Sequence, residues 1–515
     1  MKFSLGGFAV AASLGALASA ADSSCPDYTT YSQSPQGNAS TGSLGLPYMR
    51  PDPACRTFNS SVVEKVISDV TSRMKDPDLA RLFENTFPNT LDTTVKYFNS
   101  SENLAFIITG DINAQWLRDT GNQFAQYRPL LSQDKELATL VKAVINNEAR
   151  YVSEYPYCGA FQPPPESGLP PTVNTYALLV DTEPPVNNQT VFECKYELDS
   201  LAGFLKLSVS YYTETKDKGM MTDQWLNAID QIFQVINNQS QASFDSNWNW
   251  YSSYNWTGEP GSYSPQVVND GAGEPRGYTG LVGSHHRPSD DICIFPFITS
   301  DNAMMSVELT NLANVLDDAQ IMPNISAMAK NYSQTIHDAI WNHTVVAGAF
   351  AYETNGLGST YIMDDANVPS LLSLPYLGFL GMNDSTYVAT RNRVLSRANP
   401  YYAQGINFTG IGGPHVDAWN PWPMSQITNI FGTDSDDEII KSLGLIANNT
   451  YGLGLIHESV NIYNGSDYTR PWFAWANSYF SEMILDLAQR KPHLIFTDNT
   501  PYIIGNSTSS NSTSS

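Results

Sequence analysis

Amphipathic segments recur along this chain and constrain its fold more than any other feature. In each segment, apolar residues return every three or four positions, which places them on one face of an α-helix. Helices are expected at about residues 60–70, 137–145, 197–213, 225–236, 303–316, 325–341, 386–397, 438–447 and 475–489. Strand patterns are few and short, and long loops rich in Gly, Pro, Asn and Trp separate the helices. The sequence therefore predicts an all-α domain of stacked helical hairpins.

The helical segments belong to one domain. No shift in composition divides the 515 residues, and no repeat of fixed length indicates a solenoid. We expect the main domain at 57–495, preceded at 21–56 by an irregular leader rich in Pro, Ser and Gly. A low-complexity tail of Ser, Thr and Asn is expected at 496–515.

Residues 1–20 have the pattern of a secretory signal peptide. Lys2 precedes a short apolar run, and Ala18-Ser19-Ala20 supplies small residues at the cleavage position. The run is too short to cross a bilayer, and no second long apolar run follows. Many N-x-S/T acceptors, such as Asn188 and Asn407, agree with secretion. We therefore expect an extracellular or cell-wall glycoprotein.

The charge balance argues against two classes of partner. Acidic residues number 51 against 27 basic ones, for a formal net charge of -24. A surface this negative repels phosphate backbones and anionic lipids. We expect no nucleic acid or membrane partner, and we expect a monomer.

The five cysteines match no zinc-binding spacing. In an oxidising compartment, Cys25 with Cys55 would staple the leader, and Cys158 with Cys194 would close a loop. Cys293 would then remain as a buried thiol between two isoleucines.

A polar stretch at 109–120 combines groups that bind sugars. Asp111, Arg118 and Asp119 offer directional hydrogen bonds to hydroxyls, and Trp116 offers a flat apolar face. The alternative is a surface ion pair beside a core tryptophan.

Two adjacent carboxylates at Asp290 and Asp291 precede the apolar residues 292–295. Burial against apolar neighbours would raise the pKa of one of them, as a general acid requires. Neighbouring residues do not share a helix face, so only one would point into a site. The alternative is a helix-capping pair with Arg287 as counter-ion.

Further charged residues follow in two C-terminal stretches. Glu458, at the end of an apolar run, is a candidate general base with His457 beside it, although such a pair also occurs for structural reasons. The spacing is not H-E-x-x-H, so zinc is not indicated. Arg470, just before Pro471, is a candidate binding residue. The acidic residues at 193–199 open a helix, where capping and the helix dipole explain them without a function.

Taken together and in order, these motifs resemble those of glycoside hydrolase family 125, the metal-independent exo-α-1,6-mannosidases. The resemblance covers about 62–487 and rests on the following stretches: Thr109-Gly110-Asp111, Trp116-Leu117-Arg118-Asp119, Lys195-Tyr196-Glu197-Leu198-Asp199-Ser200, Arg287-Pro288-Ser289-Asp290-Asp291, 363–372, His457-Glu458-Ser459 and 472–477. It implies an (α/α)6 barrel that releases terminal α-1,6-linked mannose from glycans with inversion, without a metal or other cofactor. Loops at 162–186 and 246–286 look more elaborate than the family pattern.

The resemblance also implies roles for individual residues. Glu458 would be the general base, and Asp291 or Asp290 the general acid, with Asp291 preferred. The mannose pocket would be shaped by Asp111, Trp116, Arg118, Asp119, Arg287, Asp290, His457 and Arg470. Two alternatives remain: an (α/α)6 glycosidase of another linkage specificity, and a catalytically silent mannan-binding protein of the cell surface.

Overall fold

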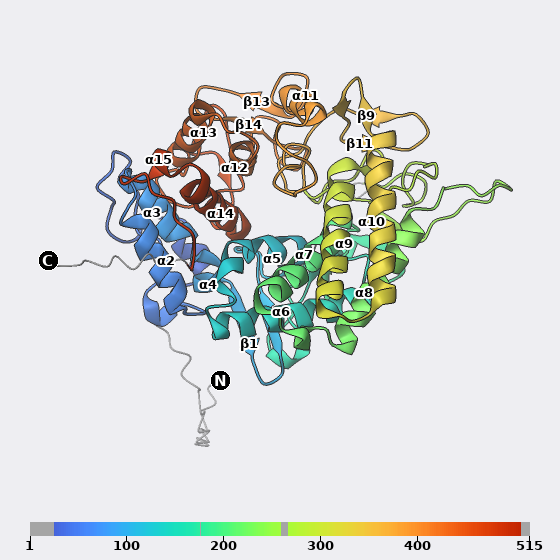
Figure 1. Cartoon of the computed structure of the whole chain (residues 1–515), viewed down its shortest axis with the longest axis horizontal. Helices are drawn as coiled ribbons and strands as arrows, with labels where there is room; N and C mark the ends of the chain where they lie inside the picture. Colours follow the sequence, from blue (N-terminus) through green and yellow to red (C-terminus); the bar gives the residue numbers. More distant parts are fainter. Residues whose placement is uncertain (1–24, 176, 259–265, 506–515) are drawn as a thin grey trace, which may run out of the picture.

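Helices are arranged in a ring in the computed structural model, which describes residues 25–175, 177–258 and 266–505 (Figure 1). The helices are α1 (Tyr28–Tyr31), α2 (Ser61–Thr71), α3 (Pro77–Thr86), α4 (Asn89–Thr93), α5 (Leu117–Gln123), α6 (Lys135–Glu154), α7 (Leu198–Thr215), α8 (Asp223–Gln239), α9 (Thr299–Ala319), α10 (Pro323–His343), α11 (Ser385–Val394), α12 (Pro423–Phe431), α13 (Asp436–Asn448), α14 (Ala474–Arg490) and α15 (Pro492–Ile495). Near the end of the chain, α14 packs against α3, α4 and α5, so the ring closes by joining late helices to early ones.

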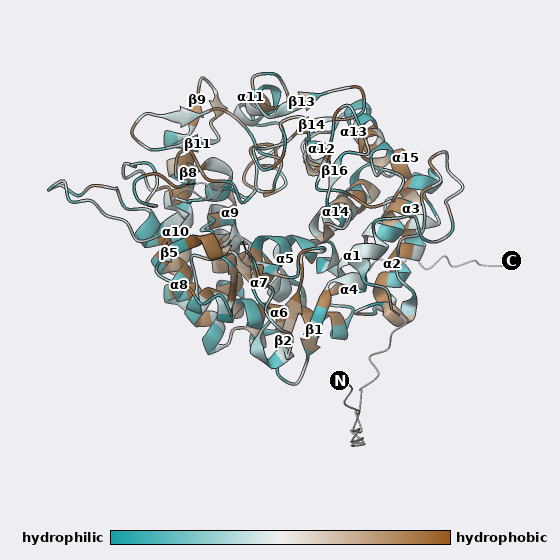
Figure 2. Ribbon diagram, turned by 180° about the vertical axis from the view of Figure 1, so that it is seen from behind, coloured by the Kyte–Doolittle hydropathy of each residue, from teal (hydrophilic) through white to brown (hydrophobic). Residues whose placement is uncertain are grey.

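The long amphipathic helices lie where the sequence predicts them. Ser60 caps α2 by accepting a hydrogen bond from the backbone N–H of Val63, at 3.1 Å. Their apolar faces meet in a continuous core, and hydrophobic residues gather where α6, α7, α8 and α9 pack together (Figure 2). The sequence did not predict α3, α5, α12 or the short helices α1, α4 and α15. In α5 every residue is buried although most of them are polar, so no apolar period marks this helix.

Small sheets of two or three strands lie between the helices. The expectation of an all-α domain did not include these sheets. The strands are β1 (Val95–Asn99), β2 (Leu104–Ile107), β3 (Gln115–Trp116), β4 (Ala160–Phe161), β5 (Val180–Glu183), β6 (Val191–Glu193), β7 (Asn255–Gly258), β8 (Phe297–Ile298), β9 (Val345–Val346), β10 (Ala349–Phe350), β11 (Glu353–Thr354), β12 (Thr360–Tyr361), β13 (Tyr402–Gln404), β14 (Thr409–Ile411), β15 (Ser459–Val460) and β16 (Tyr468–Thr469). Most have two to four residues, too short to show an alternating pattern. The antiparallel sheets β3-β4-β6 and β15-β16 hold residues of the site described below.

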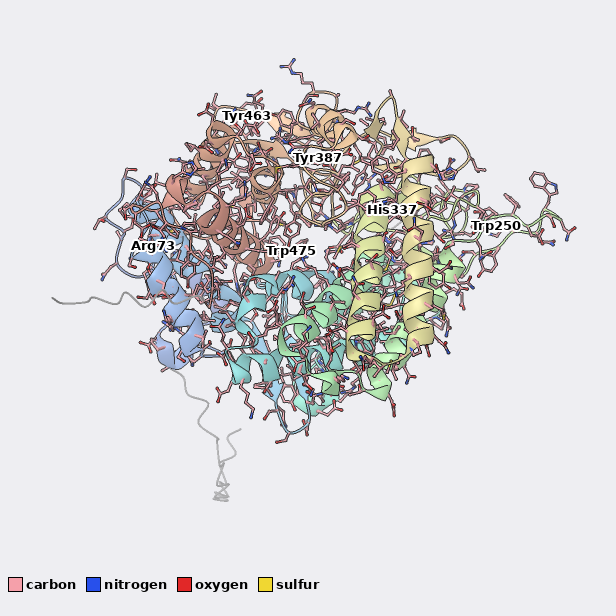
Figure 3. The ribbon with its side chains drawn as sticks, viewed as in Figure 1. Arg73, Trp250, His337, Tyr387, Tyr463 and Trp475 are labelled. Carbon is pink, nitrogen blue, oxygen red and sulfur yellow. A yellow bond between two sulfur atoms is a disulfide. The ribbon has the colours of Figure 1, made fainter. Side chains whose placement is uncertain are left out.

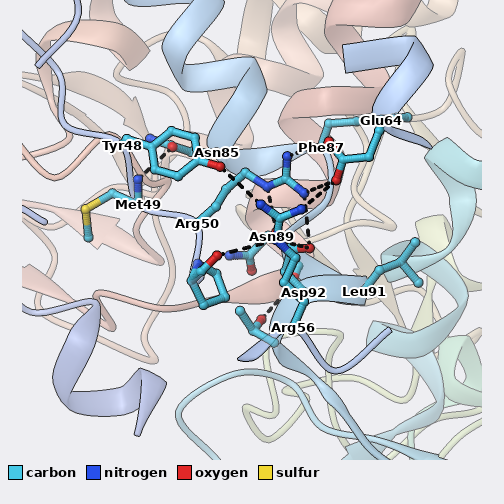
Figure 4. A network of polar contacts seen from close by, with 12 residues as sticks. Tyr48, Met49, Arg50, Arg56, Glu64, Asn85, Phe87, Asn89, Leu91 and Asp92 are labelled. Carbon is cyan, nitrogen blue, oxygen red and sulfur yellow. Dashed lines mark hydrogen bonds and ion pairs between the residues drawn. The ribbon is translucent and has the colours of Figure 1, made fainter. Parts of the chain in front are cut away.

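The leader is anchored to the ring. The predicted disulfide Cys25–Cys55 is present, and the guanidinium of Arg50 lies between two carboxylates (Figure 4). Arg50 Nε donates to Asp92 Oδ2 at 2.7 Å, and Nη1 donates to Glu64 Oε2 at 2.9 Å. Arg56 Nη1 donates to the other oxygen of Glu64 at 2.8 Å. Two arginines therefore meet two carboxylates.

The second predicted disulfide, Cys158–Cys194, is also present and ties β4 to the segment after β6. Cys293 has no disulfide partner, but it is half-buried rather than buried, because its segment lies near the surface and the neighbouring Ile294 is 46% exposed.

The C-terminal segment packs beyond residue 495. Phe496 is fully buried, and the backbone of Thr497 donates to the carbonyl of Arg73 at 2.9 Å. The predicted signal peptide at 1–20 and the last part of the predicted tail, 506–515, lie outside the described residues. In the described part of the chain, no helix has the length and apolar character needed to cross a membrane.

Candidate active site

A cavity of about 150 Å³ brings together residues from five separate parts of the sequence. It is lined by Thr109, Ile112, Trp116, Arg118, Asp119, Pro288, Ser289, Asp290, Asn367, His415, Trp422, Glu458, Arg470, Phe473 and Trp475. Trp475 lies near the middle of the ring (Figure 3). Another cavity, of about 280 Å³, lies beside the 171–193 segment, but Glu193 is the one carboxylate among its described lining residues. The smaller cavity has three carboxyl groups in its lining, those of Asp119, Asp290 and Glu458, and is therefore the better candidate for acid–base catalysis.

The turn from β3 into α5 places three of the predicted residues in this cavity. Trp116 is the last residue of β3, which pairs with β4, and its ring meets the ring of Phe192 edge-on at 5.4 Å. Arg118 and Asp119 follow in the first turn of α5 and are buried. Burial raises the pKa of the Asp119 carboxyl to about 6, although the guanidinium groups of Arg118 and Arg470 oppose the rise.

Arg118 holds four carboxyl groups around one guanidinium. Its Nη1 donates to Glu197 Oε2 at 2.9 Å, and its Nη2 donates to Asp290 Oδ1 at 3.4 Å. Asp199 Oδ2 lies 3.6 Å from Nη1, and Asp119 Oδ2 lies 3.5 Å from Nε. One positive charge cannot neutralise four carboxylates, so in a buried cluster some of them retain protons.

Two glycines let α5 and α7 approach closely enough for this arrangement. A Cβ atom on Gly121 would lie 2.8 Å from the carbonyl oxygen of Gly203, and one on Gly203 would lie 2.9 Å from that of Leu117. Both distances are shorter than a carbon–oxygen contact allows. The backbones therefore touch, and Arg118 on α5 reaches Glu197 at the start of α7.

Asp290 and Asp291 point to different surroundings. Asp290 has a φ of 68° in a tight turn, a conformation that Asp adopts more readily than most residues, and it lines the cavity. The carboxylate of Asp291 accepts from Ser289 Oγ at 2.9 Å and lies 3.6 Å from His415 Nδ1, outside the lining. As predicted, only one of the two faces the cavity.

The prediction that this acidic pair lies in an apolar environment is wrong. Asp290 lies among charged groups, and Ile294 in the following segment is largely exposed. Although burial opposes ionisation, the positive charges of Arg118 and Lys195 hold the pKa of Asp290 well below its usual range. No helix begins at this pair, so the capping alternative is also wrong.

Glu458 and Arg470 enter the cavity from the hairpin β15-β16. Glu458 precedes β15 and its backbone N–H donates to Thr469 at 3.2 Å, while Arg470 follows β16. Arg470 Nη1 lies 3.6 Å from Glu458 Oε1, and its Nε donates to Asp111 Oδ1 at 2.7 Å. Asp111 is not among the residues that line the cavity, and its hydrogen bond orients the side chain of Arg470.

Two further predicted residues lie behind the cavity wall. The ring nitrogens of His457 lie 3.3 Å from the carbonyl oxygen of Arg470 and 3.1 Å from that of Thr450. Arg287 Nε donates to Glu353 Oε1 at 2.6 Å, and the other oxygen of Glu353 accepts from the backbone at Ile294 and Phe295. Arg287 therefore fixes the turn that carries Asp290.

The sequence predicted no role for several lining residues: Asn367, His415, Trp422, Phe473 and Trp475. His415 lies in a loop after β14, and its Gly-Gly-Pro-His sequence matches no motif that would mark it as functional. Although burial opposes protonation, Asp291 and Glu458 raise the pKa of His415 to about 9. The cavity lining thus includes the cationic groups of Arg118, His415 and Arg470 beside its carboxylates.

A family model described as metal-independent α-mannosidase, glycoside hydrolase family 125, matches residues 76–485. The chain belongs to this family. The meiotically up-regulated gene 157 protein of Schizosaccharomyces pombe is 45% identical over 482 residues, which cover 92% of this chain and 94% of that protein.

A solved structure from Streptococcus pneumoniae shows a metal-independent α-mannosidase in a non-productive complex with α-1,6-mannobiose. It matches with a TM-score of 0.75 and 29% identity, over 84% of this chain and 99% of that one. The likeness confirms the (α/α)6 fold expected from the motifs. It also makes this family 125 chain a glycoside hydrolase of the α-mannosidase class.

Proposed function

We propose that this chain is a secreted exo-α-1,6-mannosidase that removes terminal mannose from glycans by inversion. The observation that carries the proposal is the convergence of Asp290 and Glu458 on one small cavity. An inverting glycosidase needs one carboxylic acid to protonate the leaving oxygen and one carboxylate to activate water on the other face of the sugar.

The size and lining of the cavity support exo-action. About 150 Å³, closed by the rings of Trp116, Trp422 and Trp475, suits one terminal sugar ring rather than the middle of a chain. Asp119 and the guanidinium groups of Arg118 and Arg470 offer charged partners for the hydroxyls of that sugar.

The position of Asp290 favours it over Asp291 as the general acid. A proton donor must reach the glycosidic oxygen, and Asp290 lines the cavity whereas Asp291 does not. In this assignment Asp290 gives its proton to the leaving oxygen as the bond to C1 breaks. Glu458 takes a proton from the water whose oxygen forms the new bond at C1.

The α-1,6 linkage is supported by the streptococcal relative, which was captured with α-1,6-mannobiose. The decisive test measures the release of mannose from α-1,2-, α-1,3-, α-1,4- and α-1,6-mannobiose by the wild-type protein. Preferential cleavage of the α-1,6 isomer is expected, and proton NMR of the first product should show β-mannose. Preference for another isomer, or α-mannose as the first product, would contradict the proposal.

Three variants test the assignment of the two carboxylates. Glu458→Gln and Asp290→Asn should each lower kcat on α-1,6-mannobiose by about 10²–10⁴-fold. Asp291→Asn should retain more activity than either, because its carboxylate is outside the cavity lining. Near-normal turnover by the Glu458 variant would contradict the proposed mechanism.

Secretion is tested separately from catalysis. Expressed in a eukaryotic host, the protein should appear in the medium or cell wall, with Ala21 as its N-terminal residue and with N-linked glycans on some acceptors. A cell-retained protein with residues 1–20 intact would contradict this part of the proposal.

A further inference from the structure

Glu197 is a buried acidic residue that the proposed mechanism does not use. It precedes the first residue of α7, where an acidic side chain normally caps the helix. Its carboxyl makes no capping hydrogen bond. It turns instead toward Arg118 Nη1, 2.9 Å away, and Oε2 also accepts from Ser200 Oγ at 3.0 Å. The capping explanation from the sequence is therefore wrong for this residue.

The Glu197 carboxyl lies next to the proposed general acid. The two terminal nitrogens of Arg118 hold one carboxyl each, Nη1 that of Glu197 and Nη2 that of Asp290. The second oxygen of Glu197, Oε1, is fully buried and has no protein donor. Two carboxyl groups held this close cannot both ionise easily, and a proton between them satisfies the oxygen that lacks a donor.

We propose that Glu197 is a positioning residue that shares one proton with Asp290 and supplies it when a glycan enters the cavity. This inference rests on the proposed inverting mechanism. Before substrate binds, the proton is mainly on Glu197. When the sugar displaces water, the proton moves to Asp290, which then donates it to the glycosidic oxygen. Both carboxyl groups are then ionised, and the pair regains one proton from solvent after the products leave.

The charges around the pair favour this resting distribution. Burial raises the pKa of Glu197 well above its ordinary value, and the neighbouring Asp290 and Asp199 carboxyls add to the rise, while Arg118 opposes it. The pKa of Asp290 is held low, as described above. The titratable and charged groups that face the pair from the packed elements are Arg118, Asp119, Lys195, Asp199, Tyr254, His286, Cys293 and His415.

The arrangement resolves a conflict in the site. Asp290 alone, beside Arg118 and Lys195, would be ionised at working pH and unable to act as an acid. When Asp290 is paired with Glu197, a proton remains on the Glu197 carboxyl, close enough to pass to Asp290 despite the positive charges nearby.

A comparison of two leaving groups tests the proposal on the intact protein. Breakdown of α-1,6-mannobiose needs a proton on the leaving oxygen, whereas a 2,4-dinitrophenyl α-mannoside has a leaving group that departs without one. Glu197→Gln should therefore lower kcat/KM on mannobiose by about 10²–10⁴-fold, and on the dinitrophenyl substrate by less than about tenfold. The alkaline limb of the mannobiose pH profile should move to lower pH.

Glu148→Gln is the matched control. Glu148 is another fully buried glutamate, bonded to Gln115 at 3.0 Å and outside the cavity lining. Its variant should leave the ratio of the two activities unchanged. An unchanged ratio in Glu197→Gln would overturn the proposal. If both activities fell equally, Glu197 would have a structural role, and if neither fell, it would have no role in the reaction. Wild-type protein that cleaves neither substrate would instead refute the proposed function.

Gly159→Ala provides a second variant if Glu197→Gln does not fold. A Cβ atom on Gly159 would lie 2.9 Å from Glu197 Oε2 and 2.8 Å from Ser200 Oγ, so it displaces the carboxyl without removing it. The same selective loss on mannobiose is expected. Parallel activity on both substrates relative to wild type would contradict the proposal.

Discussion

Two networks in this protein, each built around a buried arginine, differ in charge balance. Around Arg50 and Arg56, two guanidinium groups meet the carboxylates of Glu64 and Asp92 (Figure 4). Around Arg118, one guanidinium meets four carboxyl groups. The balanced network fastens the leader to the ring. The unbalanced one keeps acidic protons inside the site, which is the condition that acid catalysis needs.

The largest difference between the two networks should follow Arg→Lys substitution. Arg118→Lys should lower kcat/KM on α-1,6-mannobiose by about 10³-fold or more, because an ammonium group cannot hold two carboxyls on two fixed nitrogens. Arg50→Lys, the matched change in the leader, should alter the same constant by less than about threefold. Similar losses in both variants would erase the functional distinction between the networks.

Removal of the leader arginine should affect stability instead of activity. Arg50→Met leaves the buried carboxylate of Asp92 without its closest partner, which should lower the free energy of unfolding by about 3–5 kcal/mol. Denaturant melts measure the change, and kcat at a temperature where the variant is folded should match wild type. Loss of activity in the folded variant would show that the leader network also shapes the cavity.

The acid surplus predicts a pH dependence of stability. Burial raises the pKa of Asp119 to about 6 and that of Asp199 to about 7, both above the ordinary value for Asp. Raised carboxyl pKa values contribute stability that is complete below about pH 4 and is lost as pH rises through 6 to 7. Asp199→Asn should make this decline shallower, by about 1–3 kcal/mol between pH 4 and pH 8. An unchanged slope would mean that Asp199 is already ionised in the folded protein.

The smallest effect is expected from a chelator. If protons balance the surplus carboxylates, EDTA should leave kcat and KM on α-1,6-mannobiose unchanged. A loss of activity that added calcium restores would show that a cation balances them instead.

The sequence predicted the parts of the molecule that depend on local pattern. The long helices and both disulfides follow from the sequence. So do the lining residues Trp116, Arg118, Asp119, Glu458 and Arg470, through motifs that occur in a fixed order. Residues that reach the cavity from distant parts of the chain could not be predicted from local pattern. His415 reaches the cavity from a loop between short elements, and no residue near it in sequence marks it as functional.

The same limit explains the residues that were placed differently. Arg287 and Asp290 are three positions apart, yet one pairs with Glu353 behind the wall and the other lines the cavity. Local sequence shows which residues are charged but not which partner each meets. Glu197 looked like a helix cap because Arg118, its actual partner, comes from a helix 79 positions earlier in the chain.

The cavity is completed by a junction between the two ends of the main domain. Gly110 bridges Phe473, the backbone of Asp111 donates to Trp472, and that of Ala474 donates to Thr109. A ribosome adds the second half of this junction, with Glu458 and Arg470, long after it has added Thr109 and Arg118. The growing polypeptide therefore has no assembled cavity until both halves of the junction have been synthesised.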